Sequence, residues 1–356
     1  MVESDKLRVL VLGDSRSFHI ERYLPELRRQ NCEVLLASLE AGRIEYFQLK
    51  WRGPIRQLHY RLAVPELREL LSNFKPDIVD AHFASGYGHL AALALEGMST
   101  PLIVHLWGSD ILIVPKKSFL HKMKTVKALK NADAIVADSE YLLNEARKLA
   151  PLKQTLVSPF GIERKYLELH KKSYEFSHPL KIIIPRPHEE VYNNLFVLKS
   201  LSPLLKAGQI TLTFPDFGTL NIEFKFQYRA LNVSGVSFYR QCEREEFLKL
   251  MSVHDVYLSA SRSDSSPVSM IESMALGLVP AAAKIPGIEE WAKDSGALTF
   301  EQDNSTELVA VINRIISEGD SLGVMRTNNL ERVRKDALYE NNIAARVDLM
   351  RQLVNR

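Results

Sequence analysis

The chain has 356 residues, of which 46% are hydrophobic and 25% charged, and its formal net charge is +3. This length suffices for two domains with cores of their own, and the small net charge argues against nucleic acid as a partner. The two cysteines, Cys32 and Cys242, argue against a disulfide framework or a zinc site, and no apolar run approaches the roughly 18 residues of a membrane span.

The first half of the chain alternates short apolar runs with amphipathic segments. Its first run, Leu7 to Leu12, predicts a buried strand that begins too early to leave room for a signal peptide, so we expect a cytoplasmic protein. Further strands are expected at Val34 to Ala37, Asp77 to Ala81, Leu102 to Leu106 and Ala134 to Ala137, and helices at His19 to Gln30, Pro65 to Phe74 and Lys117 to Lys130. This alternation predicts a parallel sheet with helices on both faces.

The second half has the same alternation without a sequence repeat. Pro159 and Gly161 interrupt a segment that would otherwise continue a strand, which marks the passage between the two domains. We therefore place the first domain at residues 1–158 and the second at 159–335. Strands are expected at Lys181 to Pro185, Ile210 to Phe214, Val236 to Phe238, Val256 to Ala260 and Val279 to Ala283, with a helix at Glu245 to Ser252. The pattern from Leu330 to Asn355 is helical, and residues 336–356 are expected to form a C-terminal helix.

The stretch from Asp255 to Trp291 carries the strongest functional signal. A polar loop follows its first strand, Pro267 opens a helix, and Gly277 closes it before the next strand. In open parallel sheets such loops bind ligands, because the helix N-terminus offers free N–H groups. Asp264 in the loop and Glu272 two helical turns later therefore carry carboxylates that could face one crevice.

This stretch resembles the donor-sugar site of family 4 retaining glycosyltransferases, which have the GT-B fold. The family pattern is an acidic residue, seven residues, then Glu, a small-apolar-Gly turn and a Gly-containing loop; the matching residues are Asp264, Glu272, Met274 to Gly277, and Pro286 with Gly287. The resemblance implies that Asp264 contacts the donor sugar and that Glu272 holds the nucleotide ribose. It also implies that the loop and helix start, Ser265, Ser266, Pro267 and Val268, hold the diphosphate.

Other segments resemble the same family. Arg186 stands where the family has a phosphate-binding arginine, but the lysine that usually follows is replaced by Val191, Tyr192 and Asn193; Tyr192 and Asn193 can donate hydrogen bonds but no charge. In the first domain the resemblance covers Gly13 to Arg22, Pro76 to His82 and Trp107 to Asp110, where Trp107 replaces a usual histidine. It implies that these loops surround the acceptor and the reacting sugar, with Gly13, His19 and Asp110 as site residues and His82 as a weaker candidate.

Several of these residues also have purely structural interpretations. Arg186 could form a surface ion pair, Asp264 could interact with the helix dipole, and Ser266 could cap the helix. His19 and His82 could be ordinary core or surface residues. Glu272 is harder to explain in this way, because a charge inside an apolar helix is costly without a partner.

The resemblance implies an α/β protein of the GT-B fold, with two Rossmann-like domains whose parallel sheets face each other across a cleft and a C-terminal helix that returns to the first domain. The implied reaction is retaining transfer of a sugar from a UDP- or GDP-linked donor to a glycan or lipid-linked acceptor. The sequence contains neither Asp-x-Asp nor Gly-x-Gly-x-x-Gly, so we expect no metal and no cofactor besides the nucleotide sugar. The alternatives are a non-catalytic relative that serves as a binding or scaffold subunit, and a sugar-nucleotide epimerase.

Two basic stretches with interleaved apolar residues lie in the expected acceptor domain. Lys116 to Lys130 contains six lysines and no acid, and Tyr46 to Arg61 combines Lys and Arg with aromatic residues. Such mixtures suit an anionic membrane surface, each basic residue contributing about 1 kcal/mol, and they predict peripheral contact with the inner face of a membrane. The alternative is a solvated helix face and a long loop.

Overall fold

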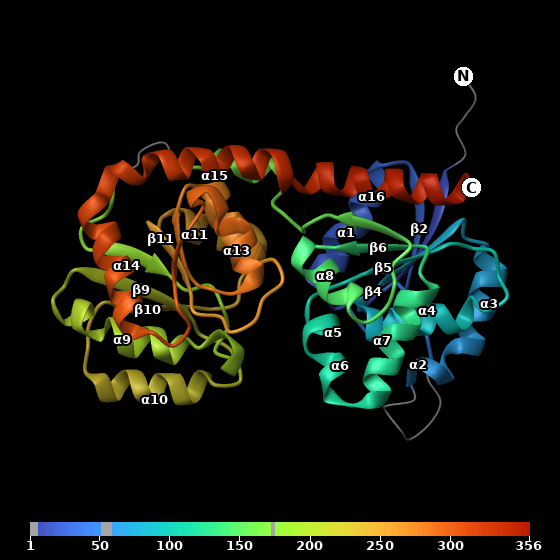
Figure 1. Cartoon of the computed structure of the whole chain (residues 1–356), viewed down its shortest axis with the longest axis horizontal. Coiled ribbons are helices and arrows are strands. Elements are labelled where there is room, and N and C mark those ends of the chain that lie inside the picture. The colour runs from blue at the N-terminus through green and yellow to red at the C-terminus, as the bar shows by residue number, and fades with distance from the viewer. Residues whose placement is uncertain (1–5, 51–58, 172–174) are drawn as a thin grey trace. The chain divides into compact units, whose positions relative to one another are not determined.

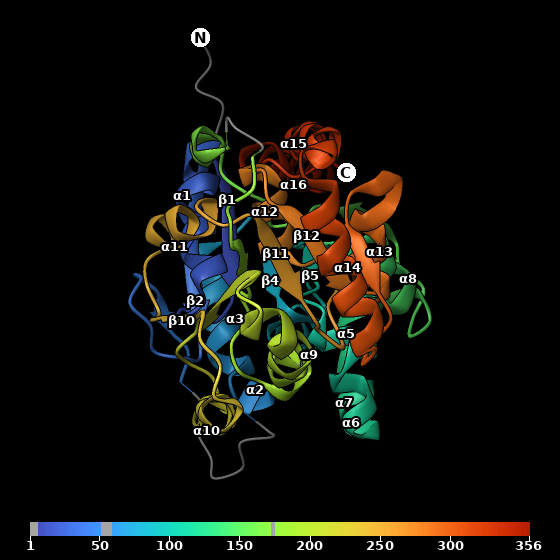
Figure 2. The same ribbon diagram turned by 90° about the vertical axis from the view of Figure 1, so that its left-hand side faces the viewer.

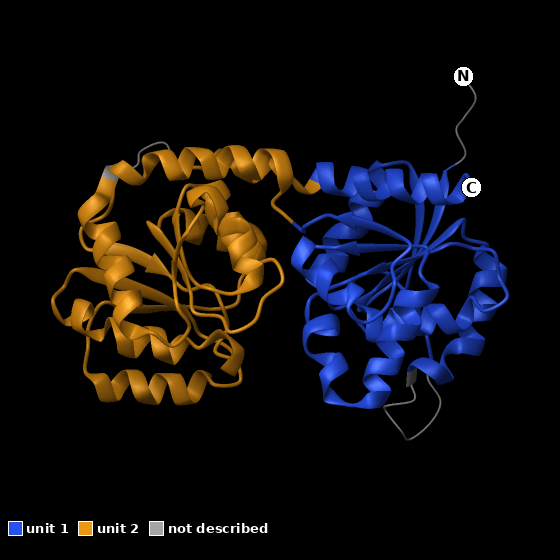
Figure 3. Cartoon of the chain, in the orientation of Figure 1, with its two compact units in different colours: residues 1–160, 340–356 blue, residues 161–339 orange. Residues whose placement is uncertain are grey.

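The computed structural model describes residues 6–50, 59–171 and 175–356, which form two compact units (Figures 1 and 3). Unit 1 comprises residues 1–160 and 340–356, and unit 2 comprises residues 161–339. The chain leaves unit 1 after Phe160, where Ser158 was expected, and returns at Glu340, where residue 336 was expected. Both boundaries between the units lie later in the sequence than expected. Ile162 forms a parallel bridge with Leu338, so the two connecting segments are joined to each other inside unit 2.

Unit 1 contains a seven-stranded parallel sheet with the order β3-β2-β1-β4-β5-β6-β7. Its strands are β1 (Leu7–Leu12), β2 (Cys32–Ser38), β3 (Phe47–Gln48), β4 (Ile78–His82), β5 (Leu102–His105), β6 (Ala134–Ala137) and β7 (Gln154–Val157). All strands predicted in this half are present, and β3 and β7 are additional. Every residue of β4 and of β5 is buried, as expected for parallel strands covered on both faces.

The helices of unit 1 surround this sheet (Figure 1). They are α1 (Phe18–Arg29), α2 (His59–Leu62), α3 (Val64–Phe74), α4 (His89–Ala94), α5 (Ser109–Leu112), α6 (Val114–Lys117), α7 (Phe119–Asn131), α8 (Glu140–Arg147) and α16 (Tyr339–Val354). Of these, α2 and α6 pack on other helices. The predicted C-terminal helix, α16, belongs to unit 1 from Glu340 onward. Its buried Arg346 donates to the side chain and the carbonyl of Ser158 at 2.8 and 2.6 Å, which holds the helix beside the end of β7.

Unit 2 contains a six-stranded parallel sheet with the order β10-β9-β8-β11-β12-β13. The strands are β8 (Leu180–Ile183), β9 (Ile210–Pro215), β10 (Val236–Tyr239), β11 (Val256–Ser259), β12 (Val279–Ala283) and β13 (Leu298–Phe300). Side chains alternate between two cores: Val256 and Leu258 point to one, and Tyr257 points to the other.

Helices therefore cover both faces of the second sheet (Figure 2). They are α9 (Asn194–Lys206), α10 (Asn221–Leu231), α11 (Arg244–Ser252), α12 (Val268–Leu276), α13 (Pro286–Ala292), α14 (Ser305–Glu318) and α15 (Gly323–Asp336). The core that contains Val256 receives residues of α9, α10 and α14, and the core that contains Tyr257 receives residues of α11, α12, α13 and α15. Each unit is thus a doubly wound, Rossmann-like domain, as predicted.

The helical pattern from Leu330 to Asn355 is present as parts of two helices, because the chain breaks between α15 and α16. At the break, Ile162 N donates to the carbonyl of Ala337 at 3.0 Å. Gly161 has a φ of +56°, and a Cβ on it would lie 2.1 Å from the oxygen of Ala337. Only glycine allows the two segments to approach this closely.

Candidate functional site

Arg186 and Asp264 lie just beyond the carboxyl ends of two neighbouring strands of unit 2. Arg186 follows β8 and Asp264 follows β11, and these strands pair in parallel where the strand order reverses. An open parallel sheet binds its ligands at such a switch point, because the loops on its two sides diverge there. The fold of unit 2 therefore brings together two residues that the sequence analysis selected independently.

The guanidinium of Arg186 donates a hydrogen bond to Oδ2 of Asp264, and both side chains are largely buried, with 18% and 16% of their surface exposed. Burial disfavours the charged guanidinium, but the carboxylate more than offsets this and raises the pKa of Arg186. The ion pair that the structural alternative predicted for Arg186 is present, but it is largely buried at the switch point instead of lying on an open surface. Phosphate binding by Arg186 stays a prediction.

The start of α12 differs from the prediction. Pro267 is the N-cap residue in extended conformation, and the first helical residue is Val268, which is half-buried. No described side chain caps this helix. Ser266 Oγ instead accepts from the indole N–H of Trp291 at 3.1 Å, so its N-cap interpretation is wrong. Ser265 N donates to Asp264 Oδ1 at 3.0 Å, which fixes the carboxylate before the helix.

The predicted glycine-containing loop after β12 is the first turn of α13. A Cβ on Gly287 would lie 2.4 Å from the carbonyl oxygens of both Asp264 and Ser265. Glycine is therefore required at this position so that α13 can support the loop that carries Asp264.

Glu272 projects from the middle of α12 and is bound to an arginine that the sequence analysis did not select. Arg244, the first residue of α11, donates to Glu272 through Nη1. It also donates to Glu163, from Nη2 at 2.7 Å and from Nε at 3.0 and 3.1 Å. Burial disfavours the charge on Arg244, but the two glutamates raise its pKa. Glu272 is only 3% exposed, so this partner explains how its charge is tolerated inside the unit.

Tyr192 and Asn193, which stand near the position of the usual lysine, have different surroundings. The guanidinium of Arg186 lies 5.1 Å from the centroid of the Tyr192 ring, so Tyr192 belongs to the Arg186 site. Asn193 has a φ of +55° and precedes α9, and its Nδ2 donates to Asp303 at 2.8 Å. This contact directs the amide of Asn193 to the loop after β13.

In unit 1, the predicted residues lie after β1 and β5. A Cβ on Gly13 would lie 2.8 Å from Cδ1 of Ile20, so packing against α1 accounts for this glycine. The half-buried ring of His19 lies 5.5 Å from Trp107 and 4.2 Å from Phe160, measured between ring centroids. Residues that follow β1, β5 and β7 at the carboxyl edge of the sheet thus form one aromatic cluster.

Asp110 is fully buried at the start of α5. Its Oδ1 accepts from the backbone N–H of Trp107 at 2.9 Å, and its Oδ2 accepts from that of Ala84 at 2.7 Å. Burial raises the pKa of Asp110 to about 6, although these N–H groups act in the opposite direction. The two oxygens thus bind the segments that follow β4 and β5, which is a structural role, and the catalytic role of Asp110 stays a prediction.

The predicted basic helix is confirmed as α7, and it exposes apolar side chains as well as lysines. Phe119, Leu120 and Met123 are 75%, 67% and 51% exposed, whereas Ala128 and Leu129 face the core. Much of the second basic stretch, residues 51–58, lies outside the described residues. Throughout the described ranges, we find no helix with the length and apolar character that crossing a membrane requires.

Comparisons with known proteins agree with this architecture. The family described as "Glycosyl transferase 4-like" matches residues 8–139, and the one described as "Glycosyl transferases group 1" matches residues 163–332. TuaC of Bacillus subtilis (strain 168), a glycosyltransferase whose name assigns it to teichuronic acid biosynthesis, is 30% identical over 129 residues, which are 36% of this chain and 32% of TuaC. The match therefore spans only about a third of that relative.

Two crystal structures of Alr3699/HepE from Anabaena share the fold of the whole chain. The complex with UDP has a TM-score of 0.79 at 15% identity and covers 97% of this chain and 99% of the other; the complex with UDP-glucose has a TM-score of 0.77 at 17% identity and covers 96% and 99%. With one family model on each unit and a GT-B neighbour across both, the chain belongs to the GT-B glycosyltransferases of family 4, glycosyl transferases group 1.

Proposed function

We propose that the protein is a retaining glycosyltransferase that moves a sugar from a nucleotide-diphosphate sugar to a glycan or lipid-linked acceptor. The observation that carries this proposal is the Arg186–Asp264 pair at the switch point of unit 2. Arg186 offers a positive charge to a leaving diphosphate, and Asp264 offers a carboxylate to the hydroxyls of the sugar. UDP is favoured over GDP as the carrier, since HepE is described in complex with UDP and UDP-glucose.

In the proposed mechanism the diphosphate replaces Asp264 as the partner of Arg186. The carboxylate is then released toward the sugar, where its negative charge stabilises the positive charge that develops at the anomeric carbon. Glu272, held by Arg244, accepts hydrogen bonds from the ribose hydroxyls. The acceptor attacks from the face that the leaving group departs, and a phosphate oxygen of the donor takes the acceptor proton.

The reaction is proposed to be independent of metal ions. Arg186 and the backbone N–H groups at the start of α12 supply positive charge and hydrogen bonds where a metal–diphosphate clamp would otherwise act. Undiminished turnover in excess EDTA is the expected result. Complete loss of turnover that Mn²⁺ restores would contradict this part of the proposal.

The acceptor is proposed to be presented at an anionic membrane surface. The exposed Phe119, Leu120 and Met123 lie on the same helix as Lys122 and Lys130, which are also exposed. An apolar wedge flanked by lysines matches the chemistry of a bilayer that contains acidic lipids, since the rings and chains enter the interface while the ammonium groups meet the headgroups.

Calorimetry with UDP, GDP, UDP-glucose and GDP-mannose tests the donor site. We expect binding of a uridine nucleotide that Arg186→Ala weakens, and NMR of the product formed from a bound UDP-sugar should show retention of the anomeric configuration. Binding without turnover toward any glycan or lipid-linked acceptor would favour a scaffold subunit, and conversion of the donor without acceptor would favour an epimerase. An inverted product would contradict the retaining mechanism.

A further inference from the structure

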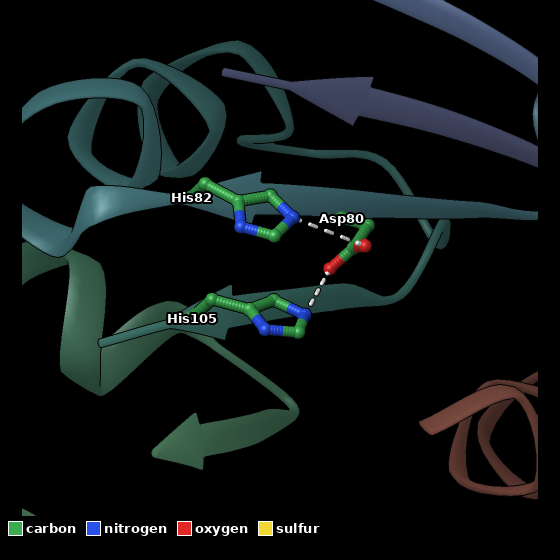
Figure 4. A group of neighbouring side chains, drawn as sticks. All are labelled: Asp80, His82 and His105. Atoms are coloured by element: carbon green, nitrogen blue, oxygen red, sulfur yellow. Dashed lines mark ion pairs between the residues drawn. The ribbon is translucent and has the colours of Figure 1, made fainter. Parts of the chain in front are cut away.

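A buried group of three titratable side chains lies at the carboxyl ends of β4 and β5 in unit 1. Asp80 and His82 are two residues apart on β4 and share one face of the sheet, and His105 is the direct neighbour of His82 on β5. None of the three side chains is more than 3% exposed. Figure 4 shows both imidazole rings directed toward the carboxylate of Asp80.

The hydrogen bonds around this group fix the position of its protons. Asp80 Oδ2 accepts from the hydroxyl of Tyr23 at 2.8 Å, and Oδ1 lies 2.7 Å from His105 Nε2. His82 Nε2 lies 3.6 Å from Oδ2. Although burial acts in the opposite direction, the two imidazoles hold the pKa of Asp80 below its usual range, and burial lowers the pKa of His105 to about 3. Asp80 is therefore ionised, accepts a hydrogen bond from Tyr23 and lies close to both imidazoles.

The hydrogen bond at Nδ1 of His82 determines which of its two ring nitrogens carries the proton. The indole N–H of Trp107 donates to His82 Nδ1 at 3.3 Å. Because an indole nitrogen only donates, Nδ1 must carry the lone pair, and the proton of the neutral ring must lie on Nε2, which faces Asp80.

One aspartate and two histidines this close together could bind a metal ion, but their contacts argue against a metal centre. A metal would need the lone pair of His82 at Nε2, where this tautomer carries its proton. In addition, the rings of His82 and His105 are stacked, with centroids 4.2 Å apart and planes 12° from parallel. Both Nε2 atoms face the Asp80 carboxylate itself, and His105 Nε2 lies 2.7 Å from Oδ1, closer than two ligands of one tetrahedral metal ion lie to each other.

We propose that Asp80 and His82 are positioning residues that hold the indole ring of Trp107 in one orientation. The Asp80 carboxylate lies 3.6 Å from His82 Nε2, too far for a hydrogen bond, but its negative charge favours a proton on that nitrogen. Nδ1 then keeps the lone pair that anchors the indole N–H. This anchoring matters because Trp107 stands where the family usually has a histidine, and its ring contacts His19 and Phe160 at centroid distances of 5.5 and 5.4 Å. The fixed ring presents an aromatic surface for a sugar, a role that rests on the proposed function.

The positioning can be tested in the full-length chain labelled with ¹⁵N-tryptophan. The indole signal of Trp107 is identified from the Trp107→Phe variant, and exchange of its proton with water is measured. We expect this exchange to become about tenfold faster in His82→Leu, which removes the acceptor. In His82→Asn, the amide oxygen takes the place of Nδ1, so the wild-type rate should be restored.

His105→Gln is the matched control. The variant changes the same buried cluster, and its glutamine amide can still donate to Asp80. The indole of Trp107 is bound to His82 and not to residue 105, so exchange of the indole proton should stay at the wild-type rate. Equal exchange in wild type and His82→Leu would overturn the proposal, as would faster exchange in the control. Tight binding of Zn²⁺ that Asp80→Asn abolishes would also overturn it and identify a metal centre.

A second measurement separates this inference from the proposed function. UDP affinity should be the same in wild type, His82→Leu and His82→Asn, whereas turnover should fall in the first variant and recover in the second. Loss of UDP affinity together with turnover in His82→Leu would contradict the positioning role. If the wild type binds UDP but transfers no sugar, the proposed function fails, and the exchange result still decides the orientation of Trp107.

Discussion

Arg186 donates a hydrogen bond to Asp264 across 78 positions of sequence, and the pair joins the loops that follow the adjacent strands β8 and β11. Each charge is the main partner of the other at the point where the strand order of unit 2 reverses. The pair is thus held together by the fold before any ligand arrives, and in the proposed mechanism a diphosphate competes with Asp264 for Arg186.

Asp264→Asn is expected to lower kcat by about 100-fold and to leave the affinity for UDP unchanged or slightly higher. The amide keeps the shape of the carboxylate but supplies no charge to the developing cation, and it competes less strongly for Arg186. Steady-state kinetics and calorimetry with UDP measure the two effects. Glu301→Gln changes an exposed acid that is paired with Lys284 and is the control. It should change neither kcat nor the affinity for UDP. Full turnover in Asp264→Asn would remove Asp264 from the mechanism.

The sequence predicted the sheets and the two acidic residues because their signals are local. Strands β4, β5 and β11 are short apolar runs, and Glu272 is a charge in a helix that is otherwise apolar. Helix α10 was missed, because Ile222 and Phe226 are exposed while Phe224 is buried, so its apolar residues do not form a single stripe.

The partners of the site residues could not be predicted because they are distant in sequence. Arg244 reaches Glu163 and Glu272 over 81 and 28 positions, and no local pattern distinguishes it from a solvated arginine at a helix start. Asp80 gave a clearer signal: an acid inside a buried strand requires a partner, and its spacing from His82 puts both on one face of the sheet. The contacts of Asp110 could not be predicted because its partners are backbone N–H groups, which the sequence does not reveal.

Arg244→Ala is expected to destabilise unit 2 by about 3–5 kcal/mol, the cost of removing one partner from a buried ion pair. The change leaves the carboxylates of Glu163 and Glu272, 16% and 4% exposed, without their shared cation. Urea denaturation measures the loss. Arg314→Ala breaks an exposed pair with Glu318 one helical turn away and should cost no more than about 0.5 kcal/mol. Equal losses in the two variants would show that the Arg244 cluster is not a structural support.

The stability of unit 1 should fall as the pH is lowered from about 6.5 toward 3, in part through His105. Burial lowers the pKa of His105 to about 3 from the ordinary 6.5, so over this window the unfolded chain binds a proton that the folded chain does not. The contribution of His105 is therefore present above pH 6.5 and is lost as the pH falls. The ring of His105 is faced by Asp80, His82, Tyr23 and Arg346. Of these groups, Asp80 opposes the lowering of the pKa of His105.

Comparison with His105→Gln tests this effect. The variant also removes the imidazole that helps to hold the pKa of Asp80 low, and both changes make stability depend less steeply on pH. Asp110, whose pKa burial raises to about 6, works in the opposite direction between pH 3.8 and 6, and it is common to both proteins. We expect the unfolding free energy of the wild type to rise with pH more steeply than that of the variant, by up to about 1.4 kcal/mol per pH unit. Parallel curves from urea denaturation at pH 4, 5, 6 and 7 would contradict the prediction.

Replacing Phe119 and Leu120 together by serine should abolish sedimentation with vesicles that contain phosphatidylglycerol at low salt. These side chains are 75% and 67% exposed, between the lysines that end α6 and those of α7. Replacing them should therefore cost little folding stability and remove much of the burial at the membrane interface. Ile222 and Phe226 on α10 are 87% and 69% exposed, but they lie in unit 2 beside Glu223. Replacing both by serine is therefore a matched control, and this variant should sediment with the vesicles as the wild type does. If both double variants bind vesicles as the wild type does, α7 is not a membrane contact; if neither binds, general exposure of apolar residues and not the lysine-flanked helix drives the association.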